Sequence, residues 1–596
     1  MTGYLVRFII WGAYLLLSYF GTMALGKLTG VRTNFAKPGY NEVADGLLAP
    51  LLLMQLGYPD GIAAYAVEDN RLGLRQIGSI GAKVALVVWI LYRSWDGKLL
   101  VFWLYFFLFV VGIMKSALWV WALQFVNDEK SSIDMLEVGA EDMSKEISIQ
   151  QVFKVIPDDK DFESAKHIMK AYYQFQFLKL QLGKWPCQPL LISPEPIPIT
   201  SYPPDHTFTT IEIELNFMFD MLFTKAAILY TKLGFIGLFI SFFCSVSALW
   251  VFAVIFRYTF MIDMYVTYTC AMLMAVISVE LYQITVLPFS DWVVVKMSMN
   301  LDVRLVRRLL PFLADWCMKQ KRWSRSIGQL NLLDHSFLYK KWWKPITVVL
   351  DWFIRSEIFR MHMLHSRQAI PSSLIALVVQ NMAEIEKKRL LQPFTERGKW
   401  TLETHGIQEK QGLSESIAKK FDQSIIIWHI ATESLLLLEK EQSDPCGGSK
   451  LLSDYMMYLL ALHPYVLSLT PAASITLEHT CCTLRHFLRD QDCREAISIL
   501  LSTNGDVTTP RGCSDMTGLT ANWHVLLEVK KLVLDLRTMD NKWEIISSIW
   551  VEMLCYAAYN CPVHHHAKLL RKGGELITHV WLLLVHRTDR FHLSID

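Results

Sequence analysis

Long stretches without a charged side chain limit what this chain can fold into more than any other feature. A membrane-spanning helix needs about 20 mostly apolar residues. Leu233–Phe256 carries no charge, and Leu99–Asn127 carries a single one, Lys115. Met264–Val279 is a third uncharged stretch, and it ends at Glu280. These stretches predict a helical bundle that crosses a membrane.

Three further segments are weaker candidates. Phe8–Gly26 has 19 uncharged residues, more than a usual signal-peptide core, so we favour a retained helix over a cleaved signal peptide. Ile77–Trp95 contains Lys83, which weakens it as a span. Gly46–Pro59 has only 14 residues and contains Pro50, which favours a buried or re-entrant helix. We therefore expect about five spans, or six if residues 46–59 also cross.

Composition agrees with a membrane protein and excludes other classes. Hydrophobic residues make up 53% of the chain and charged residues 19%, against about 25% charged residues in a soluble domain. A formal net charge of +2 argues against a nucleic-acid-binding protein, and 12% aromatic residues argue against a disordered chain. The 11 cysteines show no regular spacing, as in proteins of a reducing compartment.

Basic residues cluster directly after the last predicted span. Between Lys296 and Lys344 the chain carries eleven Lys and Arg residues but only three Asp residues. Positive charge near span ends marks the cytosolic side, so we predict that the C-terminal half is cytosolic. The loop at 128–225 is then cytosolic as well, because two spans separate it from that half. Arg93 and Lys98 fall on the opposite side, against the same rule.

The predicted fold class is all-α, with a helical transmembrane bundle followed by a cytosolic all-helical domain. In the last part of the chain, Trp543, Trp550 and Met553 recur at helical spacing, whereas Glu552 is expected on another face. Two polar breaks, Ser443–Lys450 and Ser502–Gly518, are expected to be loops between helices.

These patterns divide the chain into five segments. They are N-terminal membrane helices at 1–127, a cytosolic loop with a Pro-rich connector at 128–225, two membrane spans at 226–296, a cytosolic helical domain at 297–535, and a C-terminal helical domain at 536–596.

Motifs of catalytic or cofactor chemistry do not occur in the sequence. It contains no Walker loop, Rossmann glycine triplet, His-Glu-x-x-His or nucleophile elbow. Cys555, Cys561 and His564–His566 supply metal-ligating atoms, but their spacing matches no standard zinc site, so we favour buried thiols beside exposed histidines. We predict no catalytic residue, no cofactor and no metal site, and therefore not an enzyme.

Acidic residues near the predicted spans are the other chemical signal, because ionisable groups at membrane depth are costly and usually functional. The run Glu68-Asp69-Asn70 follows a small-residue segment. Glu280 and Asp291 lie eleven residues apart, which would place them on nearly the same face of one helix. They could form a cation or proton site. We favour the other interpretation, groups at helix ends paired with Arg257 or Lys296.

The run Lys340-Lys341-Trp342-Trp343-Lys344 combines lysines with tryptophans. Tryptophan rings settle at the headgroup level of a bilayer, and lysines are attracted to anionic lipid. Two interpretations stay open. Residues 338–358 form an interfacial helix on the cytosolic membrane surface, or they form an ordinary helix of the soluble core.

Several short runs of this sequence resemble motifs of a known protein family. In the first part of the chain they are Leu48–Leu53, Ala64–Asn70, Arg322-Trp323-Ser324, Gly328-Gln329 and Asn331-Leu332. Later runs are Trp428–Thr432, Tyr455–Met457, Trp550–Ala558, and Gly573-Gly574-Glu575 continuing to Trp581. This pattern resembles a large family of plant multi-pass membrane proteins, which carries domain of unknown function 4220 in its membrane half and domain of unknown function 594 at its C-terminus. The resemblance implies a plant integral membrane protein and implies no activity.

Two functions compete on these observations. We favour a non-enzymatic, membrane-anchored interaction or signalling scaffold, because the predicted cytosolic part is large and no catalytic motif is found. The alternative is a channel or transporter, supported by the acidic groups near the spans but without an inverted repeat in the sequence. The expected partners are the lipid bilayer and a cytosolic protein, with no nucleic acid, and the oligomeric state is left open.

The basic cluster after the last predicted span yields a topology test. Protease added to sealed, right-side-out vesicles should leave residues 300–596 intact, because the positive-inside rule places them in the vesicle lumen. Immunoblotting with an antibody to the C-terminus measures this. Digestion of the segment in sealed vesicles, with an internal soluble marker protected, would reverse the predicted topology.

Overall fold

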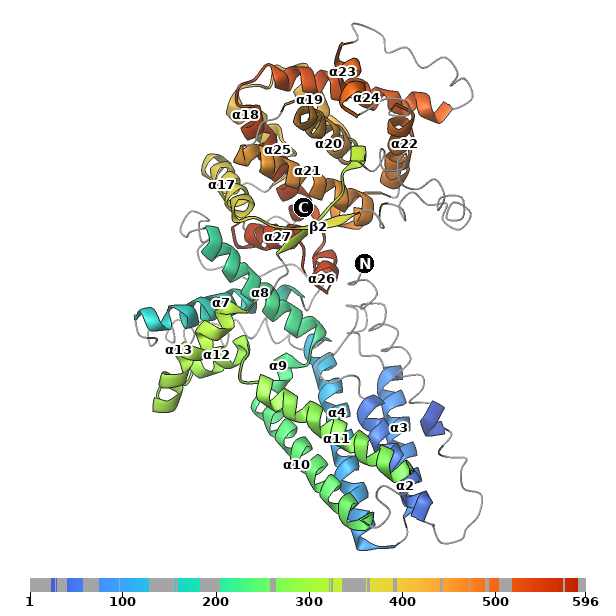
Figure 1. Ribbon diagram of the computed structural model, residues 1–596. Coiled ribbons are helices and arrows are strands. Elements are labelled where there is room, and N and C mark those ends of the chain that lie inside the picture. Colours follow the sequence, from blue (N-terminus) through green and yellow to red (C-terminus); the bar gives the residue numbers. More distant parts are fainter. Residues whose placement is uncertain are drawn as a thin grey trace. The chain divides into compact units, whose positions relative to one another are not determined.

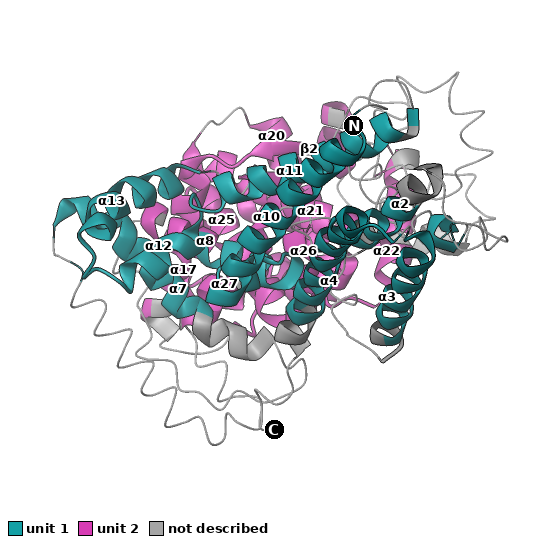
Figure 2. Ribbon diagram, turned by 90° about the horizontal axis from the view of Figure 1, so that it is seen from below, with its two compact units in different colours: residues 1–185, 213–320 teal, residues 186–212, 321–596 magenta. Residues whose placement is uncertain are grey.

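The computed structural model is mainly helical, as the sequence predicts, and divides into two compact units (Figures 1 and 2). Unit 1 comprises residues 1–185 and 213–320, and unit 2 comprises residues 186–212 and 321–596. The structure describes residues 23–26, 28, 40–56, 74–95, 97–127, 156, 159–182, 204–257, 264–320, 322, 325–334, 361, 365–389, 394–439, 443–470, 472–487, 493–502, 517–571 and 574–587.

Unit 1 contains a bundle of long helices (Figure 1). Its members are α2 (Tyr40–Leu56), α3 (Leu74–Ser94), α4 (Leu99–Asn127), α10 (Lys232–Ile255) and α11 (Met264–Val286). Helix α4 packs against both α2 and α10, and α11 packs against α10. Their shared core is apolar and includes Leu104, Leu108, Val251, Phe252 and Leu273. Hydrophobic burial and close packing therefore hold the bundle together.

Among the described residues, three helices are long and apolar enough to cross a membrane. They are Leu99–Ala122, Lys232–Ile255 and Val266–Val286, and they coincide with the three clearest spans predicted from the sequence. Their outward side chains are apolar, and in α10 Leu233, Phe243 and Trp250 are all exposed. A continuous apolar surface of this kind is unfavourable in water and favourable against lipid.

The weaker predicted spans have different outcomes. Phe8–Gly26 lies almost entirely outside the described residues. Ile77–Trp95 lies mostly within α3, which is not one of the three long apolar helices. Residues 46–56 belong to α2, where Leu47 and Leu51 are buried against the neighbouring helices. The total number of spans stays a prediction.

The rest of unit 1 is a cluster of shorter helices. It contains the 3₁₀ helix η2 (Lys160–Phe162), α7 (Glu163–Leu182), the second half of α8 (Pro204–Phe223), α9 (Ala226–Leu229), α12 (Asp291–Ser298) and α13 (Arg304–Lys319). Helix α7 packs against both α12 and α13. The centre of the cluster is aromatic, since Tyr172, Phe175, Phe217 and Trp292 lie against one another with ring centroids 5.0–6.4 Å apart.

Unit 2 is a helical body. It contains residues 321–535 of the first predicted helical domain (297–535) and the whole of the second (536–596). Its helices are α17 (Ser372–Arg389), α18 (Lys399–His405), α19 (Gln411–Ala418), α20 (Phe421–Leu438), α21 (Asp444–Leu462), η4 (Pro464–Leu467), α22 (Ala472–Phe487), α23 (Cys493–Ser502), α24 (Thr517–Arg537), α25 (Lys542–Asn560), α26 (Val563–Arg571) and α27 (Leu576–Arg587). Helices α20, α21 and α25 are its centre, and they bury Trp428, Tyr455 and Trp550 completely.

Unit 2 contains a short pair of β-strands that the sequence did not predict. Strands β1 (Ser326–Gln329) and β2 (Ser366–Ala369) are antiparallel, with Ser326 opposite Ala369. Four residues are too few to display a two-residue period, so these strands give no sequence signal. Gly328 is needed in β1 because a Cβ atom there would overlap the ring of Tyr458.

The predicted loop at Ser443–Lys450 is wrong, because α21 begins at Asp444 and runs through this segment. Pro445 occupies the first turn, where the missing N–H removes no helical hydrogen bond. Gly448 is buried, and a Cβ atom there would lie 3.1 Å from Leu377, so the small residue permits close packing with α17. At the other predicted break, α23 ends at Ser502 and α24 begins at Thr517, and the residues between lie outside the described part.

Helix α25 is buried over most of its surface rather than along one stripe, although Glu544 in its first turn is exposed. Trp543, Trp550 and Met553 are buried, in agreement with the predicted apolar face. Glu552, which was expected on another face, is also fully buried, and this corrects the amphipathic interpretation. The cause is tertiary, because α25 packs against α17, α18, α21 and α27, which cover most of its surface.

Replacement of Trp550 by Ala should lower the free energy of unfolding by about 3–5 kcal/mol, because the ring is completely buried and its Nε1–H donates to Thr432 Oγ1 at 3.2 Å. Thermal unfolding of the detergent-solubilised protein measures this. The matched control is Ile475→Ala, at an exposed position of α22, which should change stability by no more than about 0.5 kcal/mol. Equal melting temperatures for Trp550→Ala and Ile475→Ala would contradict the burial of Trp550.

Candidate functional site

An ion pair lies between the three long apolar helices of unit 1. Lys115 Nζ of α4 is 3.2 Å from Glu280 Oε1 of α11, and Ser241 Oγ of α10 donates a hydrogen bond of 2.6 Å to the same oxygen. Glu280 is fully buried and Lys115 is nearly so. In apolar surroundings the attraction between the two charges is strong, because neither water nor salt screens it. The pair therefore ties together α4, α10 and α11.

This arrangement corrects the sequence-based interpretation of Glu280. The expected partners were Arg257 or Lys296, whereas the partner in the structure is Lys115. Glu280 lies inside α11, which continues to Val286, rather than at a helix end. The expectation that Glu280 shares a helix face with Asp291 is also wrong, because a turn separates the two helices and Asp291 begins α12.

Two buried polar atoms near the ion pair of Lys115 and Glu280 have no hydrogen-bond partner among the described residues. They are Glu280 Oε2 and Ser245 Oγ. Ser245 lies one turn from Ser241 on the same face of α10. Buried polar atoms are nearly always partnered by protein or by ordered water, so these two atoms have unused capacity to bind water, a proton or an ion.

A second acidic cluster lies outside the long apolar helices, at the start of α12. Asp291 Oδ2 accepts a hydrogen bond from Asn216 Nδ2 at 3.3 Å, and Asp220 Oδ2 accepts one from Trp292 Nε1 at 3.0 Å. Asn216 and Asp220 are one turn apart on α8, which brings both to α12. Ser290 caps α12 by accepting the N–H of Trp292 through its hydroxyl, so the turn that follows α11 positions Asp291 and Trp292.

Burial raises the pKa of Asp220 to about 7. The hydrogen bond from Trp292 opposes this shift, and the negative charge of Asp291 adds to it. Aromatic rings pack around Trp292, with Phe217 at 5.0 Å and Tyr230 at 6.2 Å between ring centroids. Asp220 therefore exchanges its proton near neutral pH, unlike an ordinary aspartate.

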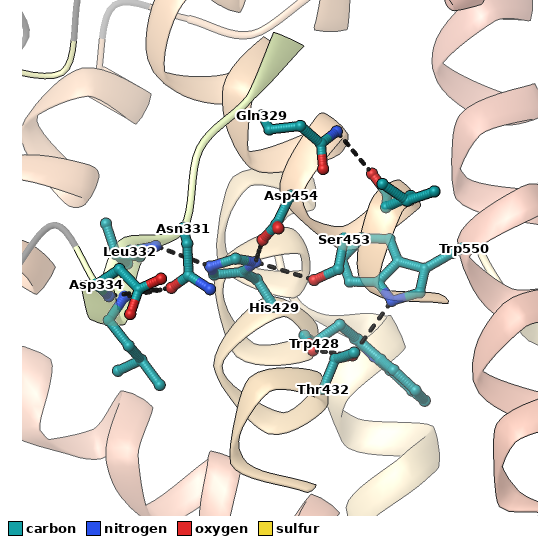
Figure 3. A network of polar contacts seen from close by, with 12 residues as sticks. Gln329, Asn331, Leu332, Asp334, Trp428, His429, Thr432, Ser453, Asp454 and Trp550 are labelled. Atoms are coloured by element: carbon teal, nitrogen blue, oxygen red, sulfur yellow. Dashed lines mark hydrogen bonds and ion pairs between the residues drawn. The ribbon is translucent and has the colours of Figure 1, made fainter. Parts of the chain in front are cut away.

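Motifs from distant parts of the sequence meet in a buried polar network of unit 2 (Figure 3). His429 of α20 is its centre. Its Nε2 accepts a hydrogen bond from the backbone N–H of Leu332 at 3.0 Å, and its Nδ1 lies 2.9 Å from Ser453 Oγ. The nearest carboxyl oxygen, Asp454 Oδ1, is 3.9 Å from Nδ1.

The residue types resemble a Ser-His-Asp triad, but the hydrogen bonds exclude that chemistry. Because Nε2 of His429 accepts from a backbone N–H, the ring proton is on Nδ1, which donates to Ser453 Oγ. A histidine in this form cannot take the proton of Ser453, as a general base must. Burial also lowers the pKa of His429 to about 3, so the ring is neutral. Its role is to join α20 and α21 to the segment after β1.

Neighbouring contacts extend the network. Gln329 Nε2 donates to the Leu451 carbonyl at 3.1 Å, and Trp550 Nε1 reaches Thr432 across the core. Burial raises the pKa of both Glu433 and Asp454. The contacts link residues from β1, α20, α21 and α25, so all four segments contribute to one core.

Glu552 of α25 holds the start of α18. Its carboxylate accepts hydrogen bonds from the backbone N–H groups of Gly398 (2.7 Å), Trp400 (3.2 Å) and Thr401 (2.9 Å), and from the Thr401 hydroxyl (2.7 Å). These are donors that a helix leaves unpaired at its N-terminus. Burial raises the pKa of Glu552, and the four hydrogen bonds oppose that shift. Gly398 adopts a φ of +118°, which favours glycine at this position.

The remaining motif residues at the C-terminus are also structural. Glu575 Oε1 pairs with Arg367 Nη2 of β2 at 2.9 Å, and Gly574 has a φ of +80° just before α27. Tyr455 Oη accepts the N–H of Ile577 at 3.1 Å. Gly573 lies outside the described residues, as do Glu68-Asp69-Asn70 and the run from Lys340 to Lys344.

The metal-ligand candidates of the sequence do not form a cluster. Within the described residues, no three His, Cys, Asp or Glu side chains are placed to hold a metal ion. Cys555 and Cys561 are buried. The expectation of exposed histidines is wrong for His566, which is buried, with its Nε2 3.3 Å from the Ala558 carbonyl and its ring stacked on Trp581.

Comparisons with known proteins agree with the motif-based resemblance. The family model described as "Domain of unknown function (DUF4220)" matches residues 11–336, more than half of the chain, and "Protein of unknown function, DUF594" matches residues 536–587. No curated protein and no solved structure matches the chain. The end of the first match, including β1 and Leu332, lies in unit 2 together with the whole of the second match.

The raised pKa of Asp220 predicts a pH-dependent stability. A carboxyl that is harder to ionise when folded contributes stability below its unfolded pKa of 3.8, and that stability is lost as the pH rises to about 7. Asp220→Asn keeps an oxygen that accepts from Trp292 but cannot ionise. The variant should therefore lose less stability than the wild type between pH 4 and pH 7, measured as melting temperatures in detergent.

The matched control for this experiment is Asp302→Asn, at an exposed position of the same unit. Its stability should follow the wild-type pH profile. Parallel profiles for the wild type and Asp220→Asn would show that Asp220 ionises in the folded protein at an ordinary pH.

Proposed function

The chain belongs to the family defined by domain of unknown function DUF4220, and from this starting point we propose that it is a multi-pass membrane protein that acts as a non-enzymatic scaffold. In this proposal the bundle of unit 1 is the anchor, and unit 2 is a rigid helical module that binds cytosolic protein partners. The three long apolar helices, with their exposed apolar side chains, support the anchor.

One observation carries the scaffold role. Three polar side chains from the runs that resemble the family point into the core of unit 2, where they bind backbone groups of other segments. His429 binds the N–H of Leu332, Glu552 binds that of Gly398, and Tyr455 binds that of Ile577. Side chains used in this way determine a shape rather than perform chemistry. A motif set that maintains one rigid surface is typical of a binding module.

The basic residues after α11 support the cytosolic placement of unit 2 in this proposal. Arg304, Arg307 and Arg308 are exposed and close to the end of a candidate span. Positive charge at this position favours the cytosolic side.

A channel or transporter is the second candidate, and the buried pair of Lys115 and Glu280 favours it. Charged groups inside a membrane bundle commonly mark an ion or proton pathway. Here Glu280 Oε2 and Ser245 Oγ have no hydrogen-bond partner among the described residues, so an ion or a proton would find free ligand atoms.

Flux measurements with the purified full-length protein in liposomes separate the two functions. For a scaffold, proton and K⁺ fluxes should equal those of protein-free liposomes. Cross-linking in native membranes, followed by mass spectrometry, should then yield a reproducible set of protein neighbours attached to lysines of unit 2, such as Lys410 and Lys531.

Glu280→Gln provides the matched control, because it removes the charge and keeps the side-chain size. If the wild type conducts and Glu280→Gln does not, the scaffold proposal is contradicted and the transport candidate is supported. Cross-links confined to unit 1 would contradict the binding role of unit 2.

A further inference from the structure

Helix α13 carries two apolar faces, although a helix at the surface of a soluble protein needs only one. The first face is buried against its neighbours α7 and α12 and consists of Leu310, Leu313, Ala314 and Cys317. The second face is open to the surroundings. Leu305 and Phe312 are each 64% exposed, and Leu309 is 42% exposed.

The open face is a continuous stripe. Leu305, Leu309 and Phe312 follow the i, i+4, i+7 spacing of one helix face, and Trp316 continues it by a further turn. At 100° per residue the stripe lies roughly 120° from the buried face. The internal packing of unit 1 therefore does not require these side chains to be apolar.

Basic residues flank this stripe. Arg304, Arg308 and Lys319 are exposed along one border, and Arg307 is also exposed. Within the part of the chain that the structure describes, none of the three arginines forms an ion pair. Asp315, the acid on the same border, accepts a hydrogen bond of 2.5 Å from Ser164. An apolar stripe with a basic border is complementary to a surface that is apolar inside and anionic outside.

The stripe starts where a candidate membrane span ends. Helix α11 ends at Val286, and the Phe289 ring in the following turn lies 4.8 Å from the Trp316 ring between centroids. Phe289 is itself 39% exposed. The apolar surface of α11 thus continues through Phe289 and Trp316 to Phe312, Leu309 and Leu305. Tryptophan at this position is typical of the headgroup region.

We propose that α13 is an interfacial helix that binds an anionic lipid surface. Leu305, Leu309 and Phe312 insert at the boundary between headgroups and acyl chains, and Arg304 and Arg308 contact the anionic headgroups. This inference rests on the proposed membrane anchoring of unit 1. It assigns the membrane contact to a segment preceding residues 338–358, for which the sequence left both an interfacial helix and a helix of the soluble core open.

The experiment uses the full-length protein in liposomes that carry a nitroxide quencher near the headgroup end of their acyl chains. A fluorescent non-natural amino acid replaces one residue at a time, which avoids the native cysteines. The test position is Leu309. Trp250, exposed on α10, reports whether the bundle is inserted, and Ile475, exposed on α22 of unit 2, reports quenching unrelated to the membrane.

We expect Leu309 and Trp250 to be quenched by the lipid nitroxide, and Ile475 to stay unquenched. Arg304→Gln and Arg308→Gln should each weaken the lipid contact of α13 about fivefold in anionic liposomes and have little effect in zwitterionic ones. Trp250 should stay quenched in both variants, which shows that they are still folded and inserted.

The other outcomes are equally informative. Quenching at Trp250 without quenching at Leu309 overturns the interfacial helix and leaves the membrane anchor intact. Loss of quenching at both positions overturns the anchor itself, and the inference with it. A fluorophore at Leu309 that neither lipid nitroxide nor aqueous iodide quenches would show that protein covers the stripe, and would also overturn the inference.

Discussion

Removing an ionisable group from water is unfavourable unless the protein supplies a partner, and both units of this protein are arranged around such groups. In unit 1 the partner of Glu280 is Lys115, supported by the hydroxyl of Ser241. The three residues come from three helices, so the polar contact selects which helices are neighbours. Apolar packing alone would stabilise the bundle but would select its arrangement far less specifically.

Unit 2 meets the same requirement with backbone groups. Glu552 accepts the free N–H groups at the start of α18, and His429 accepts the N–H of Leu332. In both cases a side chain on a central helix binds a segment far away in the sequence. Helix α20 lies between the two family matches: His429 binds Leu332 at the end of the DUF4220 match, and Thr432 accepts a hydrogen bond from Trp550 in the DUF594 match.

Sequence reasoning succeeded where a property is local and failed where it depends on neighbours. The long apolar helices that begin near Leu99, Leu233 and Met264 were recognisable because each contains a long stretch with at most one charged residue, which is visible along the chain. The segment at Ser443 was misread because Pro445 and Gly448 usually interrupt helices, whereas here the first turn accepts the proline and close packing requires the glycine. Glu552 was placed on a polar face because its burial depends on four helices that surround α25.

The sequence by itself determined the helical class, the three long apolar helices and the family, since hydropathy, helical period and motifs are all read along the chain. Only the tertiary structure decided that Glu280 pairs with Lys115, that His429 binds the backbone of Leu332 rather than serving as the base of a triad, and that α13 exposes a second apolar stripe. Each of these depends on which residues distant in sequence become neighbours, and on which side chains are left without one. Helical periodicity shows that a residue lies on a face, but the packing of the other helices decides whether that face is covered.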